Sequence, residues 1–233
     1  IAPEFLEYDP DEATNYEQGI KGELLDGRMR YSTAIYRVDW DKPQTDGFFG
    51  PLFLPGVFNA EEARTQGIEL ELTAQVSERL MATVGYNYVD AEFTKDLTGI
   101  AEDNIGSILK GDPMPGVPEH MASLSVDYYF PLDSGNEIHV NLNGSYRSSV
   151  FNQPNETFRD FGELDSFSIW NASVGWSNDK FRINAFVNNI ADEEAATGLR
   201  YRHGLEGHAF SAFDDRLVVG RPRSIGLYAS YSF

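Results

Sequence analysis

The sequence predicts an all-β protein built as an antiparallel, up-and-down sheet of about nine strands. Apolar and polar residues alternate along most of the chain, as they do in strands that have one apolar face. Helical spacing of apolar residues is hard to find over ten residues or more. The connections between these segments are short and long in strict turn, so the sheet should have two different rims.

The alternating segments mark nine strands along the chain. Residues 66–76 give the clearest case, because one face carries only apolar side chains, namely Ile68, Leu70, Leu72, Ala74 and Val76. Residues 137–147 repeat this pattern with the same period of two. The other seven strands are expected at residues 14–25, 28–40, 80–93, 117–130, 166–177, 180–190 and 220–233.

The connections fall into two classes. Tight turns of the kind found in hairpins are expected at Asp26-Gly27 and at residues 77–79, 131–136 and 177–180. Long loops are expected at residues 41–61, 96–116, 151–165 and 191–219. Loops above roughly 12 to 15 residues are uncommon in compact soluble domains. Short turns at one rim and long loops at the other are typical of outer-membrane barrels.

The two faces favour a transmembrane β-barrel. Aromatic residues gather toward the strand ends of the apolar face, where interfacial girdles lie: Tyr86, Tyr88, Tyr128, Phe130, Trp170, Trp176, Tyr231 and Phe233. The other face is polar enough for a wet lumen, with Glu69, Glu71, Asn87, Asp127, Glu137, Asn141, Asn143, Arg147 and Arg182. Strands of about ten residues tilted by about 45° span roughly 23 Å, close to the apolar band of such barrels. A soluble β-sandwich or lipocalin-like barrel also alternates in this way, so that alternative stays open.

Composition excludes some classes of function. The formal net charge of −19 argues against a nucleic-acid partner, and no stretch approaches the roughly 18 apolar residues of a membrane helix. Nine strands is an odd number, whereas bacterial single-chain barrels have an even number. We therefore expect the C-terminal part of a larger barrel, in which residues 1–11 end a long loop and Phe233 lies at the short-turn rim.

Five phrases carry a family resemblance when taken in order: "NYEQGIKGELLDGRMRYSTAIYRVDW" (15–40), "ARTQGIELELTAQVSERLMATVGYNYVDAEF" (63–93), "GDPMPGVPEHMASLSVDYYF" (111–130), "IWNASVGWSNDKFRINAFVNNIADEEAATG" (169–198) and "GRPRSIGLYASYSF" (220–233). With them, the chain resembles the C-terminal half of the barrel of TonB-dependent outer-membrane transporters over nearly all of residues 1–233. The resemblance implies a 22-stranded barrel around an N-terminal plug, of which these are the last nine strands. The plug and the earlier strands are absent from this sequence.

The resemblance also implies a function and partners. Such a receptor in the bacterial outer membrane imports a scarce nutrient, here first a ferric siderophore, with energy from the TonB complex acting through the plug. Cobalamin, haem or an oligosaccharide are further expectations for the nutrient. The implied partners are outer-membrane lipid, lipopolysaccharide and the barrel-assembly machinery, and no cofactor is expected. The terminal pattern of Ile225, Leu227, Tyr231 and Phe233 is expected to be the signal for that machinery.

The resemblance implies that ligand contacts come from the long loops, so the candidate residues are expected there. Loop 191–219 gathers Arg200, Tyr201, Arg202, His203 and His208, and its arginines could grip an anionic iron chelate or pair with nearby acids or lipopolysaccharide phosphates instead. No metal site is expected, because a histidine spacing of five in a loop specifies no geometry.

Two further loops offer alternatives. Loop 41–61 carries Phe48, Phe49, Phe53 and Phe58, which would stack on a ring of the ligand or pack the loop onto its neighbours. In loop 96–116 the acids Glu102, Asp103 and Asp112 would hold a divalent cation or form a solvated surface.

Other functions are weighed against transport. No GxSxG or HExxH motif and no cysteine is present, so we expect no enzyme. The alternatives that remain are an ungated porin-like channel and a soluble carbohydrate-binding β-protein.

Overall fold

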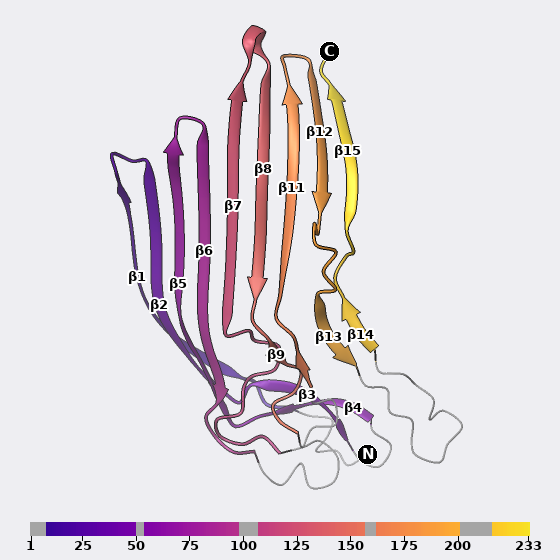
Figure 1. Cartoon of the computed structure of the whole chain (residues 1–233). Coiled ribbons are helices and arrows are strands. Elements are labelled where there is room, and N and C mark those ends of the chain that lie inside the picture. The colour runs from indigo at the N-terminus through magenta and orange to yellow at the C-terminus, as the bar shows by residue number, and fades with distance from the viewer. Residues whose placement is uncertain (1–7, 50–53, 98–106, 157–161, 201–215) are drawn as a thin grey trace, which may run out of the picture.

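The computed structural model describes residues 8–49, 54–97, 107–156, 162–200 and 216–233. They form one nine-stranded antiparallel sheet whose strands lie side by side in the order in which they occur in the chain (Figure 1). The strands, in sheet order, are β1 (Glu12–Leu24), β2 (Met29–Asp41), β5 (Glu62–Ser77), β6 (Leu80–Phe93), β7 (His120–Pro131), β8 (Glu137–Arg147), β11 (Phe167–Ser177), β12 (Phe181–Asn188) and β15 (Ser224–Tyr231). The predicted antiparallel, up-and-down order of nine strands is confirmed.

The two rims also differ as predicted. Figure 1 shows the short turns together with the C-terminus at one end of the sheet and the long connections at the other. The turn between β1 and β2 takes left-handed backbone angles at Leu25, Asp26 and Gly27 (φ of 55°, 56° and 81°). Asp and Gly accept such angles readily, which explains why the chain reverses there. A 3₁₀ turn, η2 (Asp133–Gly135), closes the connection between β7 and β8.

The long connections are more ordered than the sequence suggested. Three of them contain two-stranded ribbons: β3 (Gln44–Phe49) with β4 (Leu54–Asn59), β9 (Val150–Phe151) with β10 (Glu163–Leu164), and β13 (Ala196–Arg200) with β14 (Arg216–Val219). The sequence predicts long connections at 41–61, 151–165 and 191–219, and it does not predict the short strands that lie within them. These strands have only two to six residues, too few for an alternation to stand out between Gly and Pro residues.

Two predicted strand boundaries also need correction. The strand expected at 117–130 begins at His120, and the one expected at 220–233 runs from Ser224 to Tyr231. Pro118 and Pro222 have no N–H to donate to a ladder, which accounts for both late starts. Beyond Tyr231, only the Ser232 N–H continues the pairing, by donating to the Lys180 carbonyl at 2.9 Å.

The sheet has one apolar face that nothing in the described chain covers. Large apolar side chains on this face are widely exposed, among them Ile20, Ile35, Ile68, Leu142, Val174, Ile183, Ile225 and Leu227. Aromatic rings pair on the same face near the short-turn rim, with Tyr128 against Phe130 and Phe181 against Tyr231. A contiguous exposed apolar surface of this extent marks contact with a membrane or a partner. No helix among the described residues is long and apolar enough to cross a membrane.

Cross-strand pairs of an aromatic residue with a glycine recur in the sheet. Four pairs stand directly opposite each other in the register: Tyr31 with Gly22, Tyr36 with Gly67, Trp170 with Gly144, and Phe186 with Gly226. A Cβ added to any of these glycines would fall too close to the facing ring. The ring therefore occupies the space that the glycine leaves free, an arrangement that helps to pin strand register.

Candidate functional site

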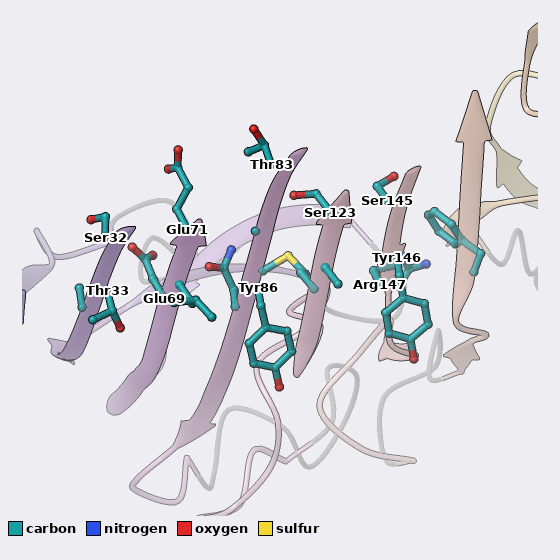
Figure 2. A pocket seen from close by; sticks show the side chains of 17 residues that line it. Ser32, Thr33, Glu69, Glu71, Thr83, Tyr86, Ser123, Ser145, Tyr146 and Arg147 are labelled. Atoms are coloured by element: carbon teal, nitrogen blue, oxygen red, sulfur yellow. The ribbon is translucent and has the colours of Figure 1, made fainter. Parts of the chain in front are cut away.

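The polar face presents its side chains in rows, because each residue stands opposite a partner on the next strand. The first row runs across six strands through Ala34, Glu69, Asn87, Met121, Arg147 and Phe167. The second row runs beside it through Ser32, Glu71, Gly85, Ser123 and Ser145. Together these rows line a hollow of about 550 Å³ on the polar face (Figure 2).

One end of this hollow is acidic. Glu69 and Glu71 lie on β5, and neither forms an ion pair with a residue of the described chain. The middle is lined by small hydroxyl side chains such as those of Ser123 and Ser145. Figure 2 shows both serines on the same side of the sheet as Glu71, whereas the Tyr86 ring points to the opposite side.

The other end of the hollow is basic. The guanidinium carbon of Arg147 lies 4.6 Å from the centre of the Phe167 ring. Its Nη1 donates to the Ser148 carbonyl at 3.3 Å, and its Nη2 donates to the Ala196 carbonyl. Within the described chain, Arg147 has no carboxylate partner within ion-pair distance. The side chain is thus held in place without its charge being neutralised.

A chain of side-chain hydrogen bonds crosses the polar face beside the hollow. Asp127 Oδ1 lies 2.7 Å from His139 Nε2 and accepts a bond from Asn141 Nδ2 at 2.9 Å. Asn143 then donates to Asn141 at 2.7 Å, and Asn171 donates to Asn143 at 2.9 Å. All three amides donate in the same direction, toward the Asp127 carboxylate, and bonds aligned in this way strengthen one another.

This hydrogen-bond chain ends at a buried asparagine. Asn189 is only 3% exposed, and its backbone N–H donates to Asn171 Oδ1 at 2.9 Å. Its side chain binds both the N–H and the carbonyl of Glu193 and also the carbonyl of Arg221. Asn189 has a φ of 52°, which asparagine tolerates better than most residues. It therefore joins the polar face to the start of connection 191–219 and to Arg221, just after its end.

The long connections form a linked rim. A small apolar core of Phe58, Ala60, Ala63, Phe93, Leu97 and Ile108 joins connection 41–61 to connection 96–116. Connection 96–116 reaches the next one through a bond from Gly116 N–H to the Phe151 carbonyl, and Asn152 Oδ1 accepts from Leu199 N–H. Each connection thus supports the next along the rim.

The segment before β1 also joins the rim. Lys42 Nζ lies 2.7 Å from Asp9 Oδ2, and this hydrogen bond raises the pKa of Lys42 above its usual value. Asn59 donates to the Asp9 carbonyl at 3.0 Å and accepts from the Asp9 N–H at 2.8 Å.

Most of the predicted ligand contacts cannot be placed against this geometry. Arg200 is the last residue of β13, and Phe48 and Phe49 end β3. The remaining candidates lie outside the described residues: Phe53, Tyr201, Arg202, His203 and His208. These candidates stay predictions. Phe58, by contrast, is buried in the rim core, as the packing alternative predicts.

Of the three acids predicted in loop 96–116, the structure describes only one. Glu102 and Asp103 lie outside the described residues. Asp112 stabilises its own loop and links it to connection 151–165, since its Oδ2 accepts bonds from the Leu109 N–H at 2.7 Å and from the Asn155 amide. No group of three or more His, Cys, Asp or Glu side chains in the described part of the chain is arranged to hold a metal ion.

Sequence reasoning placed Glu69, Glu71 and Arg147 on the polar face but did not group them. The alternation gives only the face of each strand, and strand register decides which side chains share a row. Asn189 was missed altogether, because nothing in its sequence context distinguishes a buried asparagine from one in an exposed turn.

The chain belongs to the TonB-dependent receptor family. The family described as TonB dependent receptor-like, beta-barrel matches residues 5–190. The fold agrees, because the chain superposes on the ferric yersiniabactin uptake receptor FyuA from Yersinia pestis with a TM-score of 0.72, at 19% identity over 96% of this chain and 30% of that one. Members of this family are transport receptors of the outer membrane and not enzymes, so this chain is an outer-membrane protein. The soluble carbohydrate-binding alternative is therefore wrong.

Two curated relatives show how much of a receptor is present. The chain is 34% identical to the metal-pseudopaline receptor CntO of Pseudomonas aeruginosa over 123 residues, which cover 53% of this chain and 16% of the relative. It is 27% identical to the probable TonB-dependent siderophore receptor PiuA of Acinetobacter baumannii over 196 residues, covering 81% of this chain and 24% of the relative. The chain thus spans less than a quarter of the length of either relative.

Proposed function

We propose that this chain forms the last nine strands of a closed, plugged 22-stranded barrel that imports a scarce nutrient, first a ferric siderophore, with energy supplied through TonB. The observation that carries the proposal is the pair of faces, one apolar and uncovered, the other polar and hollowed. Such a sheet suits a wall between lipid and an aqueous lumen. The edges at β1 and β15, each paired on one side only in the described sheet, are consistent with closure by earlier strands.

The substrate class draws its support from the relatives. Their names include a metal-pseudopaline receptor, a probable siderophore receptor and the ferrichrome transporter of Escherichia coli. A metal chelate is a polar molecule too large for simple pores, and it would need both a polar wall and a gated path. Residues 1–233 would supply part of that wall, and the plug that contacts the TonB complex would precede them.

The proposal includes the assembly partners. Ile225, Leu227 and Tyr231 share the apolar face of β15, and Phe233 follows two residues later. This is the position from which a C-terminal signal would be offered to the barrel-assembly machinery. The apolar face would meet the lipids of the outer membrane and, at its outer edge, lipopolysaccharide. Deleting Phe233 should lower the amount of assembled receptor at the cell surface, and normal surface levels would count against the signal.

Uptake under iron limitation tests the proposed function. Cells with and without the gene are given ⁵⁵Fe-labelled siderophores, in backgrounds with and without TonB. The proposal predicts uptake of at least one siderophore that requires both the gene and TonB. Uptake that requires the gene but not TonB would instead favour a porin-like channel, and uptake that never depends on the gene would remove the siderophore.

A further inference from the structure

We propose that a chain of amide side chains in the sheet positions connection 191–219 for capture of the nutrient, with Asn189 as the positioning residue at its end. This amide chain comprises Asn141, Asn143, Asn171 and Asn189, and it is anchored on Asp127. The inference rests on the proposed function, because it requires this connection to face the nutrient outside the cell. It adds to that function a set of residues that determine affinity without touching the ligand.

The direction of the amide chain is set at its two ends. At one end the Asn189 backbone N–H can only donate, and Asn171 Oδ1 accepts from it at 2.9 Å. At the other end the Asp127 carboxylate can only accept, here from the Asn141 amide at 2.9 Å. Each amide between these ends therefore turns its oxygen toward Asn189 and its nitrogen toward Asp127. An amide that turned over would set donor against donor, so the amides hold one another in place.

Strand register places the amides within reach of one another. Asn171 on β11 stands directly opposite Asn143 on β8, and Asn141 on β8 stands opposite Asp127 on β7. Asn141 and Asn143 are two residues apart on one strand, so both side chains lie on the polar face. The amide chain thus crosses three strands through contacts within the sheet. It needs no open space in front of the polar face and is compatible with a plug that covers this face.

Asn189 binds the chain on the way into connection 191–219 and on the way out of it. Its Nδ2 donates to the Glu193 carbonyl at 2.9 Å and to the Arg221 carbonyl at 3.1 Å, and its Oδ1 accepts from the Glu193 N–H at 2.8 Å. Both N–H donors of the side chain are therefore used. Asn189 is only 3% exposed, and a polar group left without a partner at this depth costs free energy. The side chain therefore resists release from either side.

The bonds of Asn189 lead directly into the ribbon formed by β13 and β14. Beside them, the Gly220 N–H donates to the Ala195 carbonyl at 2.8 Å. From there β13 pairs with β14 as far as Arg200, which is one of the predicted ligand contacts. A displacement at Asn189 would therefore move the whole ribbon, including the position of Arg200.

Spin-label distances test the positioning in a cysteine-free form of the full-length receptor in lipid vesicles. One label replaces Val174 on β11 and the other replaces Val218 on β14, because both side chains are exposed. The parent receptor should give one narrow distribution of distances. Asn189→Gly should broaden it, because glycine accepts the φ of 52° while the side-chain bonds are lost. Asn143→Ala should broaden it as well, since it breaks the amide chain in the middle.

Two comparisons separate positioning from a general loosening of the sheet. Asn184→Ala is the matched control, because Asn184 lies on the polar face of β12 but outside the amide chain. It should leave the distance distribution unchanged. The double variant Asn143→Ala with Asn189→Gly should broaden the distribution no further than Asn189→Gly alone, because both changes break the same chain of bonds.

Uptake kinetics test whether this position serves capture. Cells are given ⁵⁵Fe-labelled ferrichrome, ferrioxamine B or ferric pyoverdine, and rates are expressed per receptor at the cell surface. Asn189→Gly should raise the KM of the chelate that the parent receptor takes up by about tenfold, because the hydrogen bonds that order the connection are lost. The maximum rate should stay unchanged, since the transport step itself is not altered. Asn143→Ala should raise the KM by a smaller factor, and Asn184→Ala should not raise it.

Three outcomes would overturn the proposal. Unchanged distances in both Asn189→Gly and Asn143→Ala would show that the amide chain does not position the connection. Broadened distances with an unchanged KM, or uptake of none of the three chelates, would show that the position does not serve capture of these siderophores. The proposed function still stands in each case if uptake of some siderophore requires the gene and TonB. Loss of that dependence would remove the proposed function itself.

Discussion

The strands on the N-terminal side of the sheet are longer than those on the C-terminal side. The tall half, which comprises β1, β2, β5 and β6, has strands of 13 to 16 residues, whereas the short half, from β7 to β15, has strands of 8 to 12. The tall half also extends and bends toward the long connections in Figure 1. The difference shows where each half leaves the apolar band.

The apolar stretch on the outward face has the same length in both halves, although the strands do not. On β8, outward residues from Ile138 to Tyr146 occupy nearly the whole strand. On β5 the apolar stretch from Ile68 to Val76 has the same length, about 26 Å, but the strand continues through Gln66, Arg64 and Glu62. We infer that the short half ends near the membrane surface, whereas the tall half projects beyond it.

The projecting part is stabilised differently from the rest. Its outer face carries hydrogen-bonded charges, with Asp39 between Arg37 and Arg64 and with Gln66 bonded to Asp90. Its other face holds the apolar rim core around Phe93 and Ile108. The described strands of the short half have no such extension, and connection 191–219 is fixed there through bonds from Asn189 to the Glu193 carbonyl and from Arg147 to the Ala196 carbonyl.

The largest expected effect comes from emptying the rim core. Phe93 is 2% exposed, so Phe93→Ala should cost about 3 to 5 kcal/mol of local stability in the tall half. Hydrogen exchange should show faster opening of connections 41–61 and 96–116 and little change in the short half. Val174→Ala is the control, because Val174 lies exposed on the apolar face of β11. Unchanged protection of the rim in Phe93→Ala would contradict the shared core.

A charge placed on the outward face of the sheet should cost more stability in the short half than in the projecting part of the tall half. Leu142→Arg puts a cation inside the apolar band of the short half and should cost about 2 to 4 kcal/mol, whereas Gln66→Arg in the projecting part should cost about 0 to 1 kcal/mol. Reversible unfolding in lipid vesicles measures both. Similar costs at the two positions would argue against a membrane boundary between Gln66 and Ile68.

A methyl group added opposite an aromatic ring should lower the unfolding free energy by an intermediate amount. Gly144→Ala drives a methyl group into the Trp170 ring and should cost about 1 to 3 kcal/mol. Gly19→Ala in the tall half is the control, since its new Cβ would lie 3.6 Å from the Ala34 side chain and 3.3 Å from the Thr33 carbonyl. Equal unfolding free energies for the two variants would show that the Trp170 ring moves aside without cost.

The smallest effect is expected at the outer ion pairs. Asp39 and Arg64 are each about a third exposed, so Arg64→Gln should cost about 0.2 to 1 kcal/mol and less at high salt. Unfolding measured at low and high salt checks this. A loss above about 2 kcal/mol that salt does not reduce would place this pair in a low-dielectric environment, and the projection would be wrong.

The sequence predicted the sheet better than the site. Period-two alternation is a local property, so nine strands and two faces follow from residues such as Ile68 and Glu69 taken in order. The rows across the sheet depend on how separate strands pair. Glu69 and Arg147 line one hollow only because the registers of three successive strand pairs place them in the same row. The ribbons of the long connections were missed because their pairing joins short segments across turns. Arg200 and the residues that follow it remain untested as ligand contacts.

Spin labelling along β5 tests the central claim most directly, which is that the apolar face meets lipid and that the tall half leaves it between Ile68 and Gln66. Single cysteines are introduced at residues 62, 64, 66, 68, 70, 72, 74 and 76 of a cysteine-free form of the full-length receptor in vesicles, and this chain has no cysteine of its own to replace. Collisions with oxygen should dominate from 68 to 76, and collisions with a water-soluble nickel complex should dominate from 62 to 66. Access to the nickel complex along the whole strand, or lipid access that continues to 62, would contradict the account.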